Sequence, residues 1–351
     1  MGPSAVSHVQ TVTGGVDASQ LGRVLCHEHL LSLLPGPWLS GGRLPWRDGP
    51  APSFDEEQVA AAVAAVSGLA GLGFQTVVDL SPYGDVGRDA RGNNVALLRE
   101  IAQRSGVTIV TGTATYRQEF SPHWTIEASV EELVDRFVED ATTGIGDTDV
   151  RAGILGEQPT SLDHITGHEE KGLRAAARAH HRTGLAINTH TTHGTMALEQ
   201  VDLLVEERVD PRRVVIGHMD NHPDIDYVRR VLDRGVNIGF DSIGKQYWDV
   251  RVPPLADDRP DGQYAKQAIK QSDQTRAVRL AALVTEGYTG QIVLSQDLTG
   301  SQVYLNPTTH GRCGYAYLGS AFAQLLTSYG VSEADLDVML RANPARLLTI
   351  D

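Results

Sequence analysis

Short apolar runs alternate with longer amphipathic stretches along most of the chain. Each run has the length of a buried parallel strand, and the stretches between the runs have the periodicity of helices with one apolar face. The predicted strands cover residues 22–26, 76–80, 107–111, 151–155, 185–189, 213–217, 236–240 and 291–295. Helical patterns cover 55–70, 91–105, 127–141, 168–182, 194–208, 224–234, 273–287, 315–329, 332–341 and 344–348. Strands that are each followed by helix predict an α/β fold, a (β/α)8 TIM barrel, as a single domain over residues 1–351.

Two segments interrupt this alternation. Residues 35–53 are rich in proline and glycine and follow the first strand, and residues 246–272 contain VPPLADDRPDG and follow the seventh. Both should lie at the face where barrel enzymes keep their active sites. Long loops at that face usually wall or cover a site, and the alternative is that each segment is a surface insertion without a role, because loops tolerate insertions.

The charge and the cysteine count narrow the function classes. A formal net charge of −14 repels phosphate backbones and anionic lipids, which excludes nucleic-acid binding and membrane docking. No apolar run reaches the roughly 18 residues of a membrane span, and the N-terminus does not resemble a signal peptide. Two cysteines, Cys26 and Cys313, make no disulfide framework. We therefore expect a cytoplasmic protein that acts on a small-molecule substrate.

Histidines and acids gather where the predicted strands end. The first strand runs into His27-Glu28-His29, and because alternate residues of a strand share a face, the two histidines should point the same way. Four further strand ends lead to Glu157, His190, His218 and Asp297. The carboxyl ends of barrel strands meet at one rim, so these six side chains should converge. Four imidazoles and two carboxylates suit two divalent ions, Zn above all, with Mn, Co or Fe as alternatives.

The same stretches resemble the phosphotriesterase family of the amidohydrolase superfamily. The matching segments are LCHEHL at 25–30, AGILGE at 152–157, NTHT at 188–191, IGHMDN at 216–221, GFDSIGK at 239–245, LSQD at 294–297 and ANPARLL at 342–348. The resemblance implies that one metal ion is bound by His27, His29 and Asp297. It implies that His190 and His218 bind the second, more exposed ion. It also implies a homodimer, because members of the family are commonly homodimers.

The bridge between the two ions distinguishes branches of that family. Many relatives use a carbamylated lysine on the fourth strand. This chain has no lysine there, and the nearest following one is Lys171. Gly156-Glu157 resembles the phosphotriesterase-homology and lactonase-like branch, which bridges the ions with glutamate. A carboxylate supplied by Glu157 should need no carbon dioxide, so the centre should assemble without bicarbonate.

The predicted chemistry is hydrolysis. A hydroxide between two divalent ions stays ionised near neutral pH, and Asp297 beside it could take the proton and pass it to the leaving group, the catalytic role. Asp220 would carry the proton outward or be a solvated loop acid. Lactones, carboxylic esters and amides are the expected substrates. Organophosphate triester hydrolysis is the alternative, and a catalytically silent metal-binding barrel is the alternative of another class.

Three residues are candidates for contacts with the substrate. Tyr116 matches a tyrosine that faces the metal centre in lactonase relatives. Lys245 and Arg276 could hold a phosphate or carboxylate group, and a surface lysine and a helix-face arginine are the equally open alternative. Ser242 stands where lactonases of acyl-homoserine lactones tend to carry arginine, which disfavours that activity.

Overall fold

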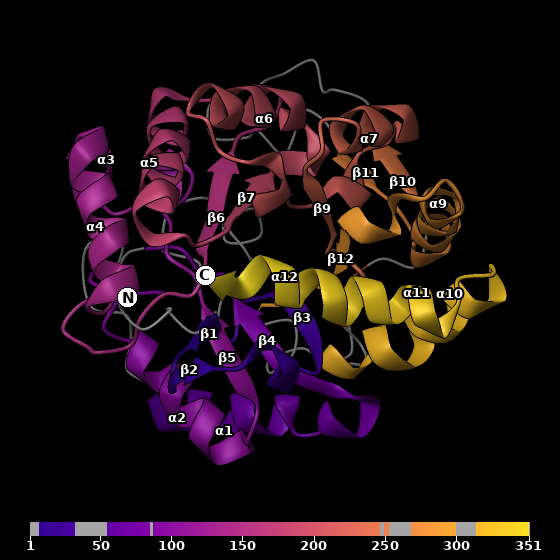
Figure 1. Cartoon of the computed structure of the whole chain (residues 1–351), viewed down its shortest axis with the longest axis horizontal. Coiled ribbons are helices and arrows are strands. Elements are labelled where there is room, and N and C mark those ends of the chain that lie inside the picture. Colours follow the sequence, from indigo (N-terminus) through magenta and orange to yellow (C-terminus); the bar gives the residue numbers. More distant parts are fainter. Residues whose placement is uncertain are drawn as a thin grey trace, which may run out of the picture.

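The eight predicted strands form a parallel barrel with helices around it (Figure 1). The structure is a computed structural model that describes residues 7–31, 55–84, 87–245, 249–252, 268–299 and 314–350. The barrel strands are β3 (Arg23–Glu28), β4 (Phe74–Asp79), β5 (Thr108–Thr111), β6 (Leu155–Thr160), β7 (Ile187–Thr191), β8 (Val214–Ile216), β9 (Asn237–Phe240) and β12 (Ile292–Leu294). The predicted fold is therefore confirmed.

The helices follow the predicted amphipathic stretches, except for the short α3, which was not predicted. They are α1 (Asp55–Val66), α2 (Val95–Ser105), α3 (His123–Glu127), α4 (Val130–Thr142), α5 (Gly167–Thr183), α6 (Ala197–Glu206), α7 (Ile225–Leu232), α9 (Asp273–Thr285), α10 (Ala323–Ser328), α11 (Glu333–Asp337) and α12 (Asn343–Leu348). Local sequence sets their ends: α5 begins after Thr166, whose side chain and that of Glu169 cap each other's backbone N–H groups. The C-terminal helices are less regular than predicted, because π-helical turns occupy Leu318–Phe322 and Val338–Ala342.

Two short seams join the strands into a barrel. The ladders run β3-β4-β5 and β6-β7-β8-β9-β12. At the first seam, between β5 and β6, the N–H of Thr113 donates to the oxygen of Ile154 over 3.1 Å. At the second, which we call the β3–β12 seam, the N–H of Asp297 donates to the oxygen of His27 over 2.9 Å. The buried carboxylate of Glu28 supports that seam by accepting from Ser295 Oγ and from the N–H groups of Gln296 and Leu298.

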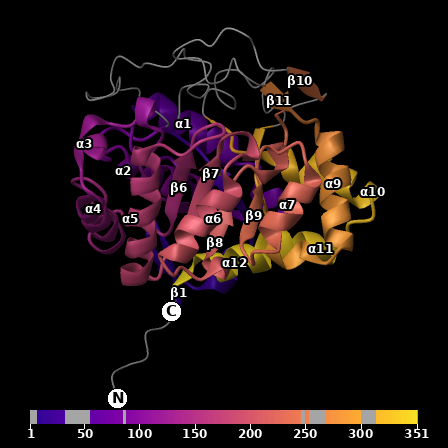
Figure 2. The ribbon, with the colours of Figure 1, turned by 90° about the horizontal axis from the view of Figure 1, so that it is seen from above.

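The apolar core has two parts. Alternate strand residues such as Leu25 and Val77 face the surrounding helices, whereas Val24 and Val78 belong to a second cluster that includes Val9 and side chains of α12. The second part is closed at the amino ends of the barrel strands by a sheet that was not predicted. It consists of β1 (His8–Thr11), β2 (Gly14–Val16) and β13 (Thr349–Ile350). Figure 2 shows β1 and the C-terminus at one end of the barrel and β10 and β11 at the other.

Two sequence predictions need correction. The fourth strand was predicted at 151–155, but β6 begins at Leu155 and continues to Thr160. Its second half is polar yet buried, because Gln158 donates to the backbone oxygen of Thr113 and Thr160 accepts from Gln200 of α6, so the apolar pattern did not reveal it. The segment 246–272, predicted as a loop, contains the antiparallel strands β10 (Val250–Val252) and β11 (Ala268–Lys270). Residues 35–53 and Cys313 lie outside the described residues.

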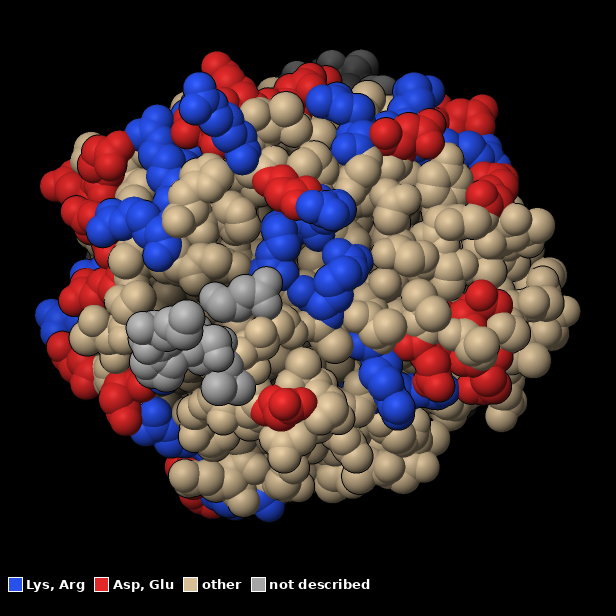
Figure 3. Space-filling view, in the orientation of Figure 1, with Lys and Arg blue, Asp and Glu red and all other residues tan. Residues whose placement is uncertain are grey.

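Arginines fix the C-terminal helix to the barrel. Arg213 donates to the backbone oxygens of Arg346 and Thr349, and Arg346 donates to the oxygens of Arg212 and Gly290. Basic side chains gather near the middle of the face that carries α12 (Figure 3). Within the described part of the chain, no helix has the length and apolar character needed to cross a bilayer.

A buried aspartate should make the stability depend on pH. Asp140 is fully buried and accepts hydrogen bonds from Thr113 Oγ1 (2.6 Å) and Tyr83 Oη (2.8 Å). Burial outweighs these bonds and raises the pKa of Asp140 to about 6. Since the folded state then binds a proton more tightly than the unfolded chain, this group destabilises the fold above pH 6 and does so less as the pH falls.

We therefore expect Asp140→Asn, which cannot titrate, to gain stability relative to the wild type as the pH rises. The difference in free energy of unfolding should shift by about 1 kcal/mol in favour of the variant between pH 5 and pH 8. Urea unfolding at both pH values measures this shift. A difference that is the same at both would contradict the raised pKa.

Candidate metal centre

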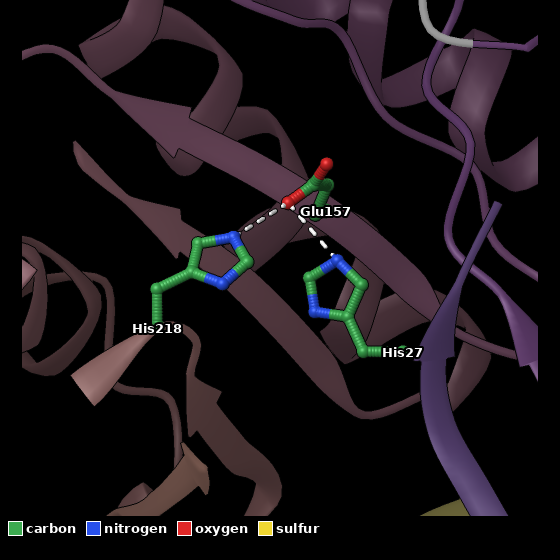
Figure 4. Close-up of side chains that lie close together, drawn as sticks. All are labelled: His27, Glu157 and His218. Atoms are coloured by element: carbon green, nitrogen blue, oxygen red, sulfur yellow. Dashed lines mark ion pairs between the residues drawn. The ribbon is translucent and has the colours of Figure 1, made fainter. Parts of the chain in front are cut away.

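The carboxylate of Glu157 lies among four histidines. Its Oε2 is 3.0 Å from Nδ1 of His190, 3.3 Å from Nε2 of His27 and 3.5 Å from Nε2 of His218. Its Oε1 is 3.5 Å from Nε2 of His29. Figure 4 shows the side chains of His27 and His218 converging on Glu157 from different strands. The structure therefore brings these five side chains together, as predicted from the strand ends.

Asp297 completes the group from the other side of the β3–β12 seam. Its Oδ1 lies 3.0 Å from Nε2 of His29 and 3.8 Å from Nε2 of His27. The backbones of Asp297 and His218 are left-handed, with φ of 49° and 59°, which is uncommon outside glycine and persists where the surroundings fix it. At Asp297 the seam hydrogen bonds and the Glu28 carboxylate provide that support.

The donor set fits divalent cations. The ligand atoms of His27, Glu157 and His218 lie within 4.8 Å of one another, and so do those of His27, His29 and Asp297. His27 belongs to both groups, and its Nε2 is buried without a hydrogen-bond partner among the described residues. Imidazole nitrogens with carboxylates suit Zn, Mn, Co or Fe. A buried nitrogen that points at a cluster of carboxylates is better explained by a cation than by a structural contact.

Electrostatics keep the two acids ionised. Although burial opposes a negative charge, His27 and His190 hold the pKa of Glu157 well below its usual range. In the same way Lys245 and His29 outweigh burial and lower the pKa of Asp297. Burial disfavours charge on His27, but Glu157 and Asp241 raise its pKa to about 10. The cluster thus holds protons that bound cations would replace.

Sequence reasoning assigned no role to Asp241, which is buried directly beneath two of the histidines. Its Oδ2 accepts from Nδ1 of His27 over 3.1 Å, and its Oδ1 accepts from Nδ1 of His218 over 2.8 Å. The one available signal was its position, immediately after β9 and at the same rim as the predicted ligands. An acid that binds the far nitrogens of metal-binding histidines is a common feature of metal sites.

The three predicted substrate contacts lie in different surroundings. Tyr116 is buried, and its ring centre is 5.4 Å from that of His190. The ammonium group of Lys245 contacts Oδ2 of Asp297. Both therefore lie beside the proposed centre, where a substrate would have to bind.

Arg276 differs from the other two because each of its three guanidinium nitrogens donates to a protein group outside the proposed ligand set. It donates to Asp220 Oδ2 over 2.6 Å, to Asn221 Oδ1 over 3.0 Å and to Asp273 Oδ1 over 3.2 Å. Asp220 is buried as well, so it is not the solvated loop acid that was one of its two readings. A substrate contact by Arg276 stays a prediction, and Lys245 is better placed for that role.

Comparison with known proteins agrees with this geometry. The profile of the phosphotriesterase family matches residues 7–348. The phosphotriesterase homology protein of Escherichia coli (strain K12) is 34% identical over 255 residues, which cover 73% of this chain and 79% of that protein. The N-acetyltaurine hydrolase of Dictyostelium discoideum is 28% identical over 79% of this chain and 70% of its own length.

A solved structure matches the whole barrel. It belongs to a protein in which organophosphate hydrolysis activity was engineered from a weak promiscuous lactonase template. The two structures superpose with a TM-score of 0.78 and 29% sequence identity, over 97% of this chain and 99% of that one. The family profile spans all the barrel strands and every residue of the proposed centre. The chain therefore belongs to the phosphotriesterase family, whose members are hydrolases that depend on a binuclear metal centre.

Proposed function

We propose that this protein hydrolyses a carbonyl compound, namely a lactone, a carboxylic ester or an amide. The observation that carries the proposal is the position of Glu157, with Oε1 toward His29 and Oε2 toward His27, His190 and His218. One carboxylate can thus serve two ions. Two divalent cations bound here would supply an activated water and polarise the carbonyl oxygen of the substrate.

The proposed ligands divide into two sets. His27, His29 and Asp297 hold one ion, His190 and His218 hold the other, and Glu157 lies between them. We propose Zn as the native ion, because imidazole-rich sites with carboxylates suit it, and Mn, Co and Fe are the alternatives. Elemental analysis of protein purified without added metal identifies the ion.

Asp297 is the proposed catalytic base. Its carboxylate is ionised at neutral pH and its side chain is 14% exposed, whereas that of Glu157 is 2% exposed. It can therefore accept a proton from the attacking water and return it to the leaving group. Tyr116 forms part of the wall beside His190, where its ring would limit the size of the acyl group.

The relatives include hydrolases of both carbonyl and phosphoryl compounds. The carbonyl class is supported by one relative named for an amide substrate, N-acetyltaurine, and by a matched structure that derives from a lactonase, whereas the aryldialkylphosphatase of Saccharolobus solfataricus is named for a phosphoryl substrate. Organophosphate triester hydrolysis is the second candidate, because that same lactonase template was engineered toward it. Membership of a family of hydrolases disfavours a catalytically silent barrel. That alternative is one of the possible outcomes of the assay described next.

A substrate panel tests the proposal. Protein with two measured equivalents of metal is assayed with lactones, aryl esters, N-acyl amino acids and an organophosphate triester, beside protein stripped by a chelator. We expect metal-dependent turnover of at least one carbonyl class at a higher kcat/KM than the triester. Preference for the triester would favour the second candidate, and no turnover of any class would favour the silent barrel.

Lys245 should select substrates that carry a negative charge near the scissile bond. Its ammonium group contacts Asp297. The other cation predicted to contact substrate, Arg276, binds three protein groups instead. Lys245→Met should raise KM for an anionic N-acyl substrate about 10-fold. This is the change in binding expected when one partly exposed contact between opposite charges is lost. The uncharged ester of the same substrate is the control. An equal change for both substrates would show that Lys245 does not read the charge.

We also propose a cytoplasmic homodimer. The compartment rests on the low cysteine count, since Cys26 and Cys313 make no disulfide framework, and the assembly rests on the family resemblance. Light scattering coupled to size-exclusion chromatography gives the mass in solution, and a monomer at micromolar concentration would contradict the dimer.

A further inference from the structure

One buried carboxylate serves a histidine from each of the two proposed ligand sets. Oδ2 of Asp241 lies 3.1 Å from Nδ1 of His27, on β3, and Oδ1 lies 2.8 Å from Nδ1 of His218, which follows β8. Oδ1 also accepts the backbone N–H of His218 over 2.9 Å. Asp241 is 1% exposed, so both contacts form away from solvent, where such hydrogen bonds are strong.

Two glycines leave space for this carboxylate, Gly239 on β9 and Gly217 directly after β8. A Cβ at Gly239 would lie 2.3 Å from Oδ2 of Asp241, and a Cβ at Gly217 would lie 3.5 Å from the same atom. Neither glycine has a positive φ, so its own backbone conformation does not require glycine. At Gly217 the requirement comes from the backbone oxygen of Thr189, which would lie 2.3 Å from a Cβ. At Gly239 the requirement comes from the carboxylate of Asp241.

We propose that Asp241 is a positioning residue that orients ligands of both metal ions at once, an inference that rests on the metal centre proposed above. A carboxylate that accepts from Nδ1 fixes each imidazole in the tautomer whose Nε2 has no proton. Those Nε2 atoms are the ones that face Glu157. Because one rigid carboxylate holds both rings, losing it should weaken both metal positions together.

Asp241→Asn tests this coupling. Asparagine keeps one acceptor oxygen, but its NH2 group opposes one of the two Nδ1–H donors, so at least one ring loses its orientation. Because the rings share the residue, we expect both equivalents of Zn to bind 10- to 100-fold more weakly in competition with a chromophoric chelator. Asp140→Asn is the control, since it changes an equally buried aspartate that binds Tyr83 and Thr113 instead, and its Zn affinity should not change.

Gly239→Ala tests the same contact without altering a hydrogen-bonding group. The new methyl should push Oδ2 away from His27 and weaken Zn binding, whereas Gly68→Ala, where a Cβ would have no neighbour within 4 Å, should leave it unchanged. If Asp241→Asn does not fold, ¹⁵N spectra of the histidine rings in Zn-loaded wild type decide, and both His27 and His218 should carry their proton on Nδ1.

The outcomes separate this inference from the function on which it rests. A wild type that binds fewer than two equivalents of Zn contradicts the metal centre itself. A wild type that binds two equivalents, with only one weakened or neither weakened in Asp241→Asn, overturns the shared role of Asp241 and leaves the centre intact. A proton on Nε2 of either ring in the Zn-loaded wild type overturns it as well.

Discussion

Asp297→Asn should lower kcat by about 10³-fold, within the range of 10² to 10⁴ that a positioned base contributes. The expectation follows from the position of the carboxylate, 3.0 Å from Nε2 of His29 and in contact with Lys245. Those neighbours lower the pKa of Asp297 despite its burial, so the group can take a proton at neutral pH. Asparagine keeps an oxygen for the metal and loses the basicity.

Measuring kcat and metal content on the same preparation separates the two roles of Asp297. Retained metal with lost activity supports the proton-transfer role, whereas lost metal assigns Asp297 to metal binding alone. The exposed Asp226→Asn, on α7, is the matched control and should behave as the wild type does. Unchanged kcat in Asp297→Asn would remove this residue from the mechanism.

Glu157→Gln should abolish the binding of at least one metal equivalent. The variant keeps the shape of the side chain and removes the charge that the four surrounding imidazoles share. We expect a loss larger than the roughly 100-fold that outer-shell changes cost, because Glu157 is a proposed ligand rather than a supporting group. Equilibrium dialysis against Zn measures it, and two equivalents bound as tightly as in the wild type would exclude the bridge.

The same residue predicts how the centre assembles. β6 contains no lysine, and Lys171, on α5, donates to the backbone oxygens of Thr125, Ile126 and Ala128. A carbamylated lysine would need carbon dioxide, but Glu157 carries its carboxylate already. Metal-free protein should therefore recover activity equally fast with Zn in bicarbonate-free buffer and in buffer with bicarbonate. Faster recovery with bicarbonate would contradict a glutamate bridge.

The barrel could be predicted because most of its strands are buried on both sides and appear as apolar runs. The fourth strand shows where that signal ends. In β6, Gln158 and Thr160 are buried because residues distant in the sequence, Thr113 and Gln200, supply hydrogen-bond partners, and an apolar pattern cannot reveal such partners. The sheet of β1, β2 and β13 was missed because its strands are very short and because β1 pairs with β13 from the opposite end of the chain. A local sequence pattern does not reveal such a distant partner.

The site could be predicted only as far as strand ends reveal it. His27 lies near the end of β3, while His29 and Asp297 follow β3 and β12, and they meet because the barrel brings the strand ends to one rim. Asp241 also follows a strand, yet its role depends on His218, 23 residues away, and on His27, 214 residues away. A single aspartate gives no sign of which side chains share its two oxygens. The pairing of Arg276 with Asp220 was hidden in the same way.

The β3–β12 seam gives the metal centre a mechanical consequence. His27 and Ser295, in contact across this seam, are 268 residues apart in the chain, and a cation held by His27, His29 and Asp297 would tie the first barrel strand to the last. In the unfolded chain such a tie closes a loop of most of the protein's length, and the entropy removed grows with the length of the loop. The ion would therefore act as a reversible cross-link, and a barrel nicked by a protease in a surface loop would stay together for as long as the ion remained bound.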